Sequence, residues 1–149
     1  MIMKIAITSG KSEGPSKLNA FDNSLLDAGI GDVNLIKVSS IIPANSEFIE
    51  LPNLKKGDMI KCVLAHSSSD KIGDKITAAI AVAISDDFGC VAESSGVNKD
   101  PNEIEKKALF MVKEMMKVRN IKVKKIIVEK ISHIVQNQGS VVAAVVYLE

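Results

Sequence analysis

Two adjacent serines, Ser39 and Ser40, interrupt an apolar, β-branched run that extends from Asn34 to Pro43. A run of this composition predicts a β-strand, and proline is typical of a strand end. In one interpretation the serines are small polar residues where the strand stops. In the other, a serine hydroxyl lies beside the peptide carbonyl of the preceding serine, which is the arrangement that a chain needs to cleave itself. The pair alone leaves both interpretations open.

Two carboxylates could act on a bound substrate. Asp22 lies among apolar residues of a predicted helix, where it is either a solvated acid that favours the helix dipole or a carboxylate directed at a cationic ligand. Glu93 ends a short apolar segment that begins at Gly89. Desolvation there would raise its pKa and allow it to donate a proton, although a strand-end carboxylate in water fits the same pattern. From the residues alone, the solvated interpretation is favoured for both acids.

The other chemistry-bearing motifs are incomplete. The tripeptide Gly10–Ser12 resembles the end of a phosphate-binding loop, but the upstream glycine at the required spacing is missing, so we expect only a mobile loop over residues 9–16. The polar segment His66–Asp74 combines a histidine with serines and an aspartate, and without a nucleophile elbow we expect a solvated loop. Cys62 and Cys90 form no CxxC motif and are expected to be buried, reduced thiols. His133 has no second histidine or cysteine nearby, so we expect a packed or half-exposed side chain and no metal site.

Composition excludes several classes of protein. The chain has 149 residues, of which 46% are hydrophobic and 25% charged, and these values predict one folded domain. The net charge of +1 and the aromatic content of 3% argue against a nucleic-acid-binding protein. No apolar run approaches the roughly 20 residues of a membrane span, and no signal peptide is evident, so a cytoplasmic location is expected.

These residues must be positioned by a mixture of helices and strands. Ile76–Ile84 is the clearest strand, with isoleucine and valine on one parity and mainly alanine on the other, which predicts a central strand with something packed close on its small face. A first helix is expected over residues 18–28, with Asn19 as its N-cap, and a second begins at Asp100. About two helices and six to eight strands point to α+β layers. The other expected strands cover residues 2–8, 46–51, 59–65, 89–96, 126–135 and 140–148.

Four segments, in order, carry a resemblance to a known family. They are Leu18-Asn19-Ala20-Phe21-Asp22, Ala28-Gly29-Ile30-Gly31, Asn34-Leu35-Ile36-Lys37-Val38-Ser39-Ser40-Ile41-Ile42-Pro43 and Ile76–Ile84. Together they resemble the pyruvoyl-dependent arginine decarboxylases, and the resemblance runs from Ser9 through the C-terminal strand. The serine pair is a weak signal by itself, whereas Asn34 at a fixed offset from it is specific.

The resemblance implies a chain that cleaves itself between Ser39 and Ser40. The Ser40 hydroxyl would attack the Ser39 carbonyl, and β-elimination of the resulting ester would leave dehydroalanine, which hydrolyses to a pyruvoyl group. The products would be a β chain, residues 1–39, and an α chain, residues 40–149, whose first residue is the pyruvoyl made from Ser40. Asn34 matches the residue that supports cleavage, through hydrogen bonds to the developing oxyanion.

The resemblance also implies the reaction and its site. The pyruvoyl group would form a Schiff base with L-arginine and accept the electrons released with carbon dioxide, giving agmatine, a polyamine precursor, without metal or pyridoxal phosphate. Glu93 aligns with the proton donor and Asp22 with the residue that pairs with the guanidinium group. The remaining implied pocket residues are Gly31, Val33 and Ile41.

The implied fold is α+β, a four-layer αββα sandwich formed by one domain of residues 1–149. Similar proteins assemble as trimers or as pairs of trimers, with active sites between subunits, so a homo-oligomer that takes arginine as a small-molecule substrate is expected. The chain departs from the pattern at Ser94-Ser95-Gly96, where bulkier or acidic residues are expected, and in the polar segment His66–Asp74. Two alternatives therefore stay open: the same chemistry on another amino acid, and a non-cleaving homologue that acts as a subunit or binding module.

Overall fold

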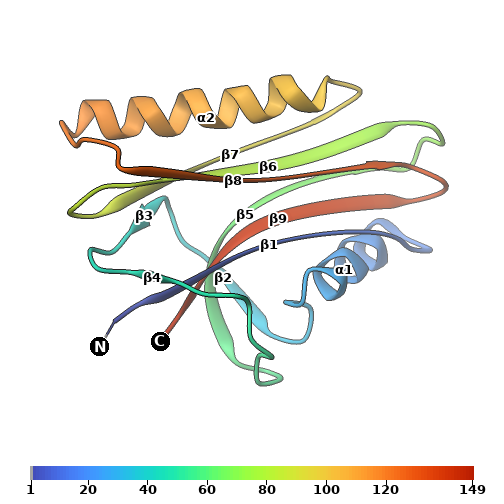
Figure 1. Ribbon diagram of the computed structural model, residues 1–149. Helices are drawn as coiled ribbons and strands as arrows, with labels where there is room; N and C mark the ends of the chain where they lie inside the picture. The colour runs from blue at the N-terminus through green and yellow to red at the C-terminus, as the bar shows by residue number, and fades with distance from the viewer. Residues whose placement is uncertain (1) are drawn as a thin grey trace.

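A computed structural model describes residues 2–149, which form two helices and nine strands in a single α+β domain (Figure 1). No helix within these residues is long and apolar enough to cross a membrane. The elements, in chain order, are β1 (Lys4–Glu13), α1 (Lys17–Asp27), β2 (Asn34–Lys37), β3 (Ile41–Ile42), β4 (Glu47–Phe48), β5 (Met59–Ser69), β6 (Lys75–Ile84), β7 (Gly89–Val97), α2 (Pro101–Val118), β8 (Lys125–Ile134) and β9 (Gly139–Leu148).

The strands form two sheets. The first sheet has five strands in the order β2-β5-β9-β1-β4, and the second has four in the order β3-β7-β6-β8. Strand β9 lies at the centre of the first sheet, antiparallel to β1 and β5, and all ten of its residues are buried. This burial agrees with its apolar side chains on both parities.

Each helix covers one sheet, and the buried side chains form three groups between these layers. One group lies between α1 and the first sheet, a second lies between the two sheets, and the third lies between α2 and the second sheet. Figure 1 shows α2 along the outer side of β6, β7 and β8, with α1 beside β1. The small parity of β6 faces α2, where Ala79, Ala81 and Ala83 contact the group around Ala108, as the sequence predicts. Isoleucine and valine of the other parity face the first sheet.

The predicted strand over residues 34–43 is wrong as a single element. Its first part, β2, pairs parallel to β5 in the first sheet, whereas β3 pairs antiparallel to β7 in the second. Between them the Val38 N–H donates to the Cys62 carbonyl oxygen at 2.9 Å, and the Val91 N–H donates to the Ser40 carbonyl oxygen at 2.8 Å. Ser39 and Ser40 therefore cross from one sheet to the other.

Two predicted loops are also corrected. Strand β1 continues through the Gly10–Ser12 tripeptide to Glu13, and β5 continues past Ala65 to Ser69. Both extensions pair with the same end of β9, whose ladder satisfies their backbone groups despite the polar side chains. Helix α1 begins at Lys17, one residue before the predicted range, and its N-cap is Ser16 instead of Asn19, because the Ser16 hydroxyl accepts a hydrogen bond from the Asn19 N–H at 3.1 Å.

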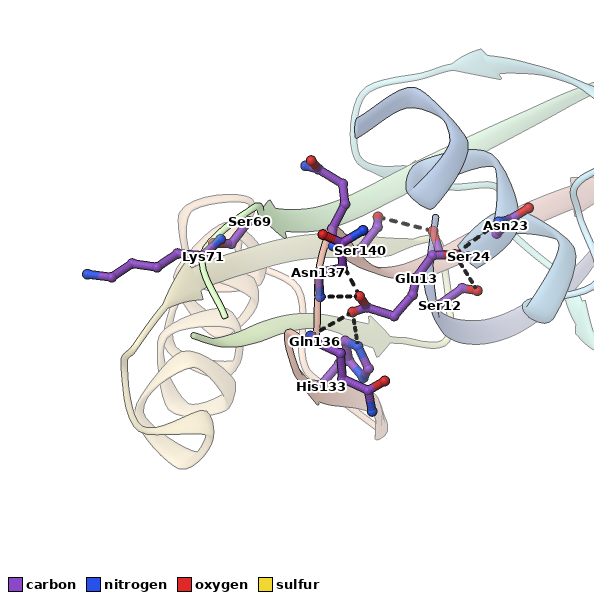
Figure 2. A network of polar contacts seen from close by, with 11 residues as sticks. Ser12, Glu13, Asn23, Ser24, Ser69, Lys71, His133, Gln136, Asn137 and Ser140 are labelled. Atoms are coloured by element: carbon purple, nitrogen blue, oxygen red, sulfur yellow. Dashed lines mark hydrogen bonds and ion pairs between the residues drawn. The ribbon is translucent and has the colours of Figure 1, made fainter. Parts of the chain in front are cut away.

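A polar network closes the end of the molecule where β1 stops (Figure 2). The Glu13 carboxylate accepts hydrogen bonds from the backbone N–H groups of Gln136, Asn137 and Gln138 at 3.2, 2.7 and 3.1 Å, and from His133 Nε2 at 2.6 Å. Burial acts to raise the pKa of Glu13, but the His133 and backbone hydrogen bonds outweigh it and the pKa is lowered. Glu13 thus ties the first sheet to the turn between β8 and β9. His133 is a packed, half-buried side chain, as predicted.

Candidate active site

The serine pair borders a cavity of about 100 Å³ formed by the end of β2 and by β5 and β7. The cavity brings Ser39 and Ser40 together with Glu93, two features that are far apart in the sequence. Its lining residues are Lys37, Val38, Ser39, Ser40, Val63, Leu64, Val91 and Glu93.

The peptide between Ser39 and Ser40 is held on both sides while its own polar groups stay free. Val38 is bonded to the first sheet and the Ser40 carbonyl to the second, as described above. Neither the Ser39 carbonyl nor the Ser40 N–H makes a backbone hydrogen bond within residues 2–149. One residue further on, the Tyr147 hydroxyl donates to the Ile41 carbonyl oxygen at 2.9 Å. This peptide is therefore anchored, with its carbonyl available to a nucleophile.

Glu93 is the acidic group of the cavity. It lies on β7 opposite Ile80 of β6, and its side chain is exposed to solvent in the single chain. Partial burial of the carboxyl group raises the pKa of Glu93, and the nearby Lys37 ammonium offsets only part of this increase. A carboxyl group with a raised pKa retains its proton to higher pH and is suited to act as a general acid.

A second cavity, of about 470 Å³, adjoins the first. Both cavities are lined by Lys37, Leu64 and Glu93, and the larger one extends to Lys107 and Met111 of α2. Ser94 and Ser95, at which the sequence departs from the expected pattern, also line it. Their small side chains leave this space open next to Glu93.

His66 also lines the larger cavity. It belongs to a strand, so the loop predicted for it is wrong, whereas its exposure to solvent agrees with the prediction. It lies on β5, and its ring meets that of Phe21 at 5.4 Å between centroids and an angle of 62°. Burial lowers the pKa of His66, and the ammonium groups of Lys37 and Lys17 lower it further, which favours the neutral imidazole. Sequence analysis missed Lys37 altogether. Its place two residues before Ser39 was the available signal.

Asp22 is exposed on α1 and lines neither cavity. Leu26 lies one helical turn further along the same face of α1 and packs closely against Gly31. The approach is so close that a Cβ atom added to Gly31 would lie only 2.6 Å from Leu26 Cγ. Asp22 and Gly31 therefore lie near the same face of α1, and both are outside the cavity that contains Ser40.

Asn34 is also separate from the serine pair. It begins β2 and its side-chain amide donates to the Gly57 carbonyl oxygen at 3.0 Å, whereas Ser39 follows the other end of this strand. Val33 packs beneath α1, and Ile41, next to Ser40, is 38% exposed. Within a single chain, the predicted site residues Ser39, Ser40 and Glu93 therefore lie together at one cavity. Asp22 and Asn34 lie outside this cavity.

A keto group made from Ser40 fits this position. The carbonyl oxygen of residue 40 would adjoin that keto group, and it already accepts a hydrogen bond from the Val91 N–H. This donor would stabilise negative charge that develops on the carbonyl oxygen. Within residues 2–149, no group of three or more histidine, cysteine, aspartate or glutamate side chains could hold a metal ion. Cys62 and Cys90 are buried and free, as predicted.

Comparisons with known proteins agree on one family. The family model described as pyruvoyl-dependent arginine decarboxylase matches residues 4–149. The chain is 57% identical to the pyruvoyl-dependent arginine decarboxylase of Methanothermobacter thermautotrophicus, across 100% of this chain and 99% of that protein. It is 47% identical to the protein of the same name from Thermococcus sibiricus, across 81% and 78% of the two chains, and 38% identical to that of Methanocaldococcus jannaschii, across 94% and 86%.

Proposed function

The chain belongs to the pyruvoyl-dependent arginine decarboxylase family, as the sequence motifs indicated, and we propose that it cleaves itself at Ser39–Ser40 and converts L-arginine to agmatine and carbon dioxide. One observation of the structure carries the proposal: the serine pair crosses between the two sheets at a cavity that also contains Glu93. The products of cleavage are a β chain of residues 1–39 and an α chain of residues 40–149.

Cleavage begins with the anchored peptide. Ser40 Oγ attacks the Ser39 carbonyl carbon, so that a C–O bond forms as the C–N bond breaks and an amine is released. Elimination then frees the Ser39 carboxylate, and hydrolysis of the new α-chain end releases ammonia and leaves the pyruvoyl group. The hydrogen bond to the Ser40 carbonyl holds the nucleophile's residue in place during attack.

During turnover, the pyruvoyl group supplies the carbonyl that condenses with the substrate amine and accepts the electrons left by carbon dioxide. The side chains of this protein have the other roles. Glu93, with its raised pKa, donates a proton to the α-carbon of the product. Asp22 pairs with the guanidinium group, for which a carboxylate is a suitable planar acceptor. Gly31, Val33 and Ile41 complete the pocket.

An assembly of several copies accounts for the separated residues. Asp22 and Asn34 lie outside the cavity of their own chain, so they would act in the cavity of a neighbouring copy, where Asn34 would support cleavage. Leu26, one turn after Asp22, and Ile36, two residues after Asn34, are 47% and 44% exposed, and Ile41 beside Ser40 is 38% exposed. A neighbouring copy would cover these apolar side chains. We therefore propose a trimer or hexamer with its active sites between subunits.

The finer fold and location are proposals as well. The packing of α1 on the first sheet, of that sheet on the second, and of α2 on the second supports a four-layer αββα sandwich. A cytoplasmic location fits an enzyme that acts on a free amino acid.

An intact-mass spectrum of the purified protein tests the proposal. The wild type should give two chains split between Ser39 and Ser40, with the α chain lighter by one ammonia than residues 40–149. Ser40→Ala should stay one chain and release no carbon dioxide from arginine. Ser39→Ala is the matched control and should still be cleaved, because its own hydroxyl takes no part in the attack. A wild-type chain of full mass would exclude the proposed function.

A further inference from the structure

Lys37 has no role in the mechanism described so far, yet it is the one basic residue among the three that line both cavities. It is the last residue of β2, and its side chain lines both the cavity at Ser40 and the larger one beside it. Within residues 2–149 it takes part in none of the ion pairs. Its ammonium group is close enough to influence Cys62, His66 and Glu93. A cation without an ion-pair partner is therefore present beside the reacting residue.

The smaller cavity offers a substrate few charged groups. Its lining contains one cation, Lys37, and one acid, Glu93, together with the two serines and apolar side chains. The second lysine, Lys107, lines only the larger cavity. An amino acid whose α-amine reacts at residue 40 must bring its α-carboxylate close to this carbonyl. In the smaller cavity, the carboxylate then has a single cation to meet.

We propose that the Lys37 ammonium group binds the α-carboxylate of the substrate. The proposal rests on the proposed function and adds the recognition of the end of arginine opposite its guanidinium group. Asp22 and Lys37 would then bind the two charged ends of one substrate, and Glu93 would lie next to the carboxylate that leaves. Lys37 also stays close to the electrons that remain after carbon dioxide departs, so its charge is useful before and after the bond breaks.

Two unreactive ligands isolate the carboxylate. Guanidinovalerate is arginine without its α-amine, and butylguanidine is the same molecule without the carboxylate, so neither can condense with the enzyme. Their dissociation constants are measured by calorimetry on the self-cleaved enzyme. Wild-type protein should bind guanidinovalerate more tightly. Lys37→Met should weaken guanidinovalerate binding roughly 10- to 100-fold, the loss expected for a charged hydrogen bond, and leave butylguanidine binding within about twofold.

Lys107→Met is the matched control and should change neither constant, whereas Lys37→Arg should restore most of the binding of guanidinovalerate. The proposal is overturned if Lys37→Met weakens both ligands equally, if it weakens neither, or if wild-type enzyme does not prefer guanidinovalerate. It is also overturned if Lys37→Met and Lys37→Gln both fold but stay uncleaved, because the ammonium group would then act in self-cleavage. The proposed function is tested separately, since it fails if the wild-type protein keeps its full mass or forms no agmatine, whatever the Lys37 variants do.

Discussion

Two inactive variants, Ser40→Ala and Asp22→Ala, should together restore roughly a quarter to a third of wild-type activity when they share one oligomer. Ser40→Ala lacks the reactive group. Asp22→Ala should lose about 2 kcal/mol or more of binding to the guanidinium group, which is roughly 30-fold in kcat/KM. If each site combines the cavity of one subunit with Asp22 of its neighbour, random pairing of equal amounts gives an intact cavity in half of the sites. Half of those meet an intact Asp22, so about a quarter of all sites are complete. Selection of trimers that contain both variants raises this fraction to about a third, whereas in hexamers it stays close to a quarter.

The assay co-expresses the two variants with different affinity tags and purifies through both tags in sequence. Activity is measured as carbon dioxide released from carboxyl-labelled arginine at concentrations below KM. The matched control pairs Ser40→Ala with Glu93→Gln. Ser40 and Glu93 line the same cavity of one chain, so this mixture should show no gain over Glu93→Gln alone. Doubly tagged oligomers of the first pair that remain inactive would refute the shared site and place Asp22 with Ser40 in one subunit.

Two further predictions concern carboxyl groups with opposite pKa shifts. Glu93→Gln should still be cleaved but turn over roughly 10²- to 10⁴-fold more slowly. Burial raises the pKa of Glu93 above its ordinary value of 4.5, so the protonated donor is lost only as the pH rises through the raised value. The kcat of the wild type should therefore fall on the alkaline side of this value. A kcat–pH profile of the variant should lack this decrease. Glu13→Gln should lower the free energy of unfolding at pH 7 by about 1–3 kcal/mol, because it weakens the bonds to His133 and the turn at 136–138. The pKa of Glu13 is lowered in the folded protein, so its contribution to the free energy of unfolding is present above pH 4.5 and is lost as the pH falls toward the lowered value. In urea denaturation at several pH values, the free energies of unfolding of wild type and variant should therefore approach each other in acid. A difference that stays constant with pH would contradict this role.

Features that depend on near neighbours along the chain could be predicted before the fold was known. The alternating parities of Ile76–Ile84 predicted a central strand with a small face, and Ala79, Ala81 and Ala83 indeed pack against α2. The acid and proline at Asp100 and Pro101 predicted the start of α2. The order of the motifs around Asn34 and the serine pair was enough to identify the family, because such motifs need no knowledge of contacts.

Tertiary structure alone decided how the site is assembled. The run from Asn34 to Pro43 has the composition of one strand, and only pairing with β5 and then β7 divides it at Ser39 and Ser40. The pairing of β2 with β5 and the packing of the two sheets bring Lys37 and Glu93 to the same cavity, and Asp22 stays outside it. Such contacts join residues that are far apart in the sequence. The alternation of side chains predicts the two faces of a strand, but it does not predict which other strand pairs with it. For this reason the residues proposed to react could be named from the sequence, whereas their neighbours are known only from the fold.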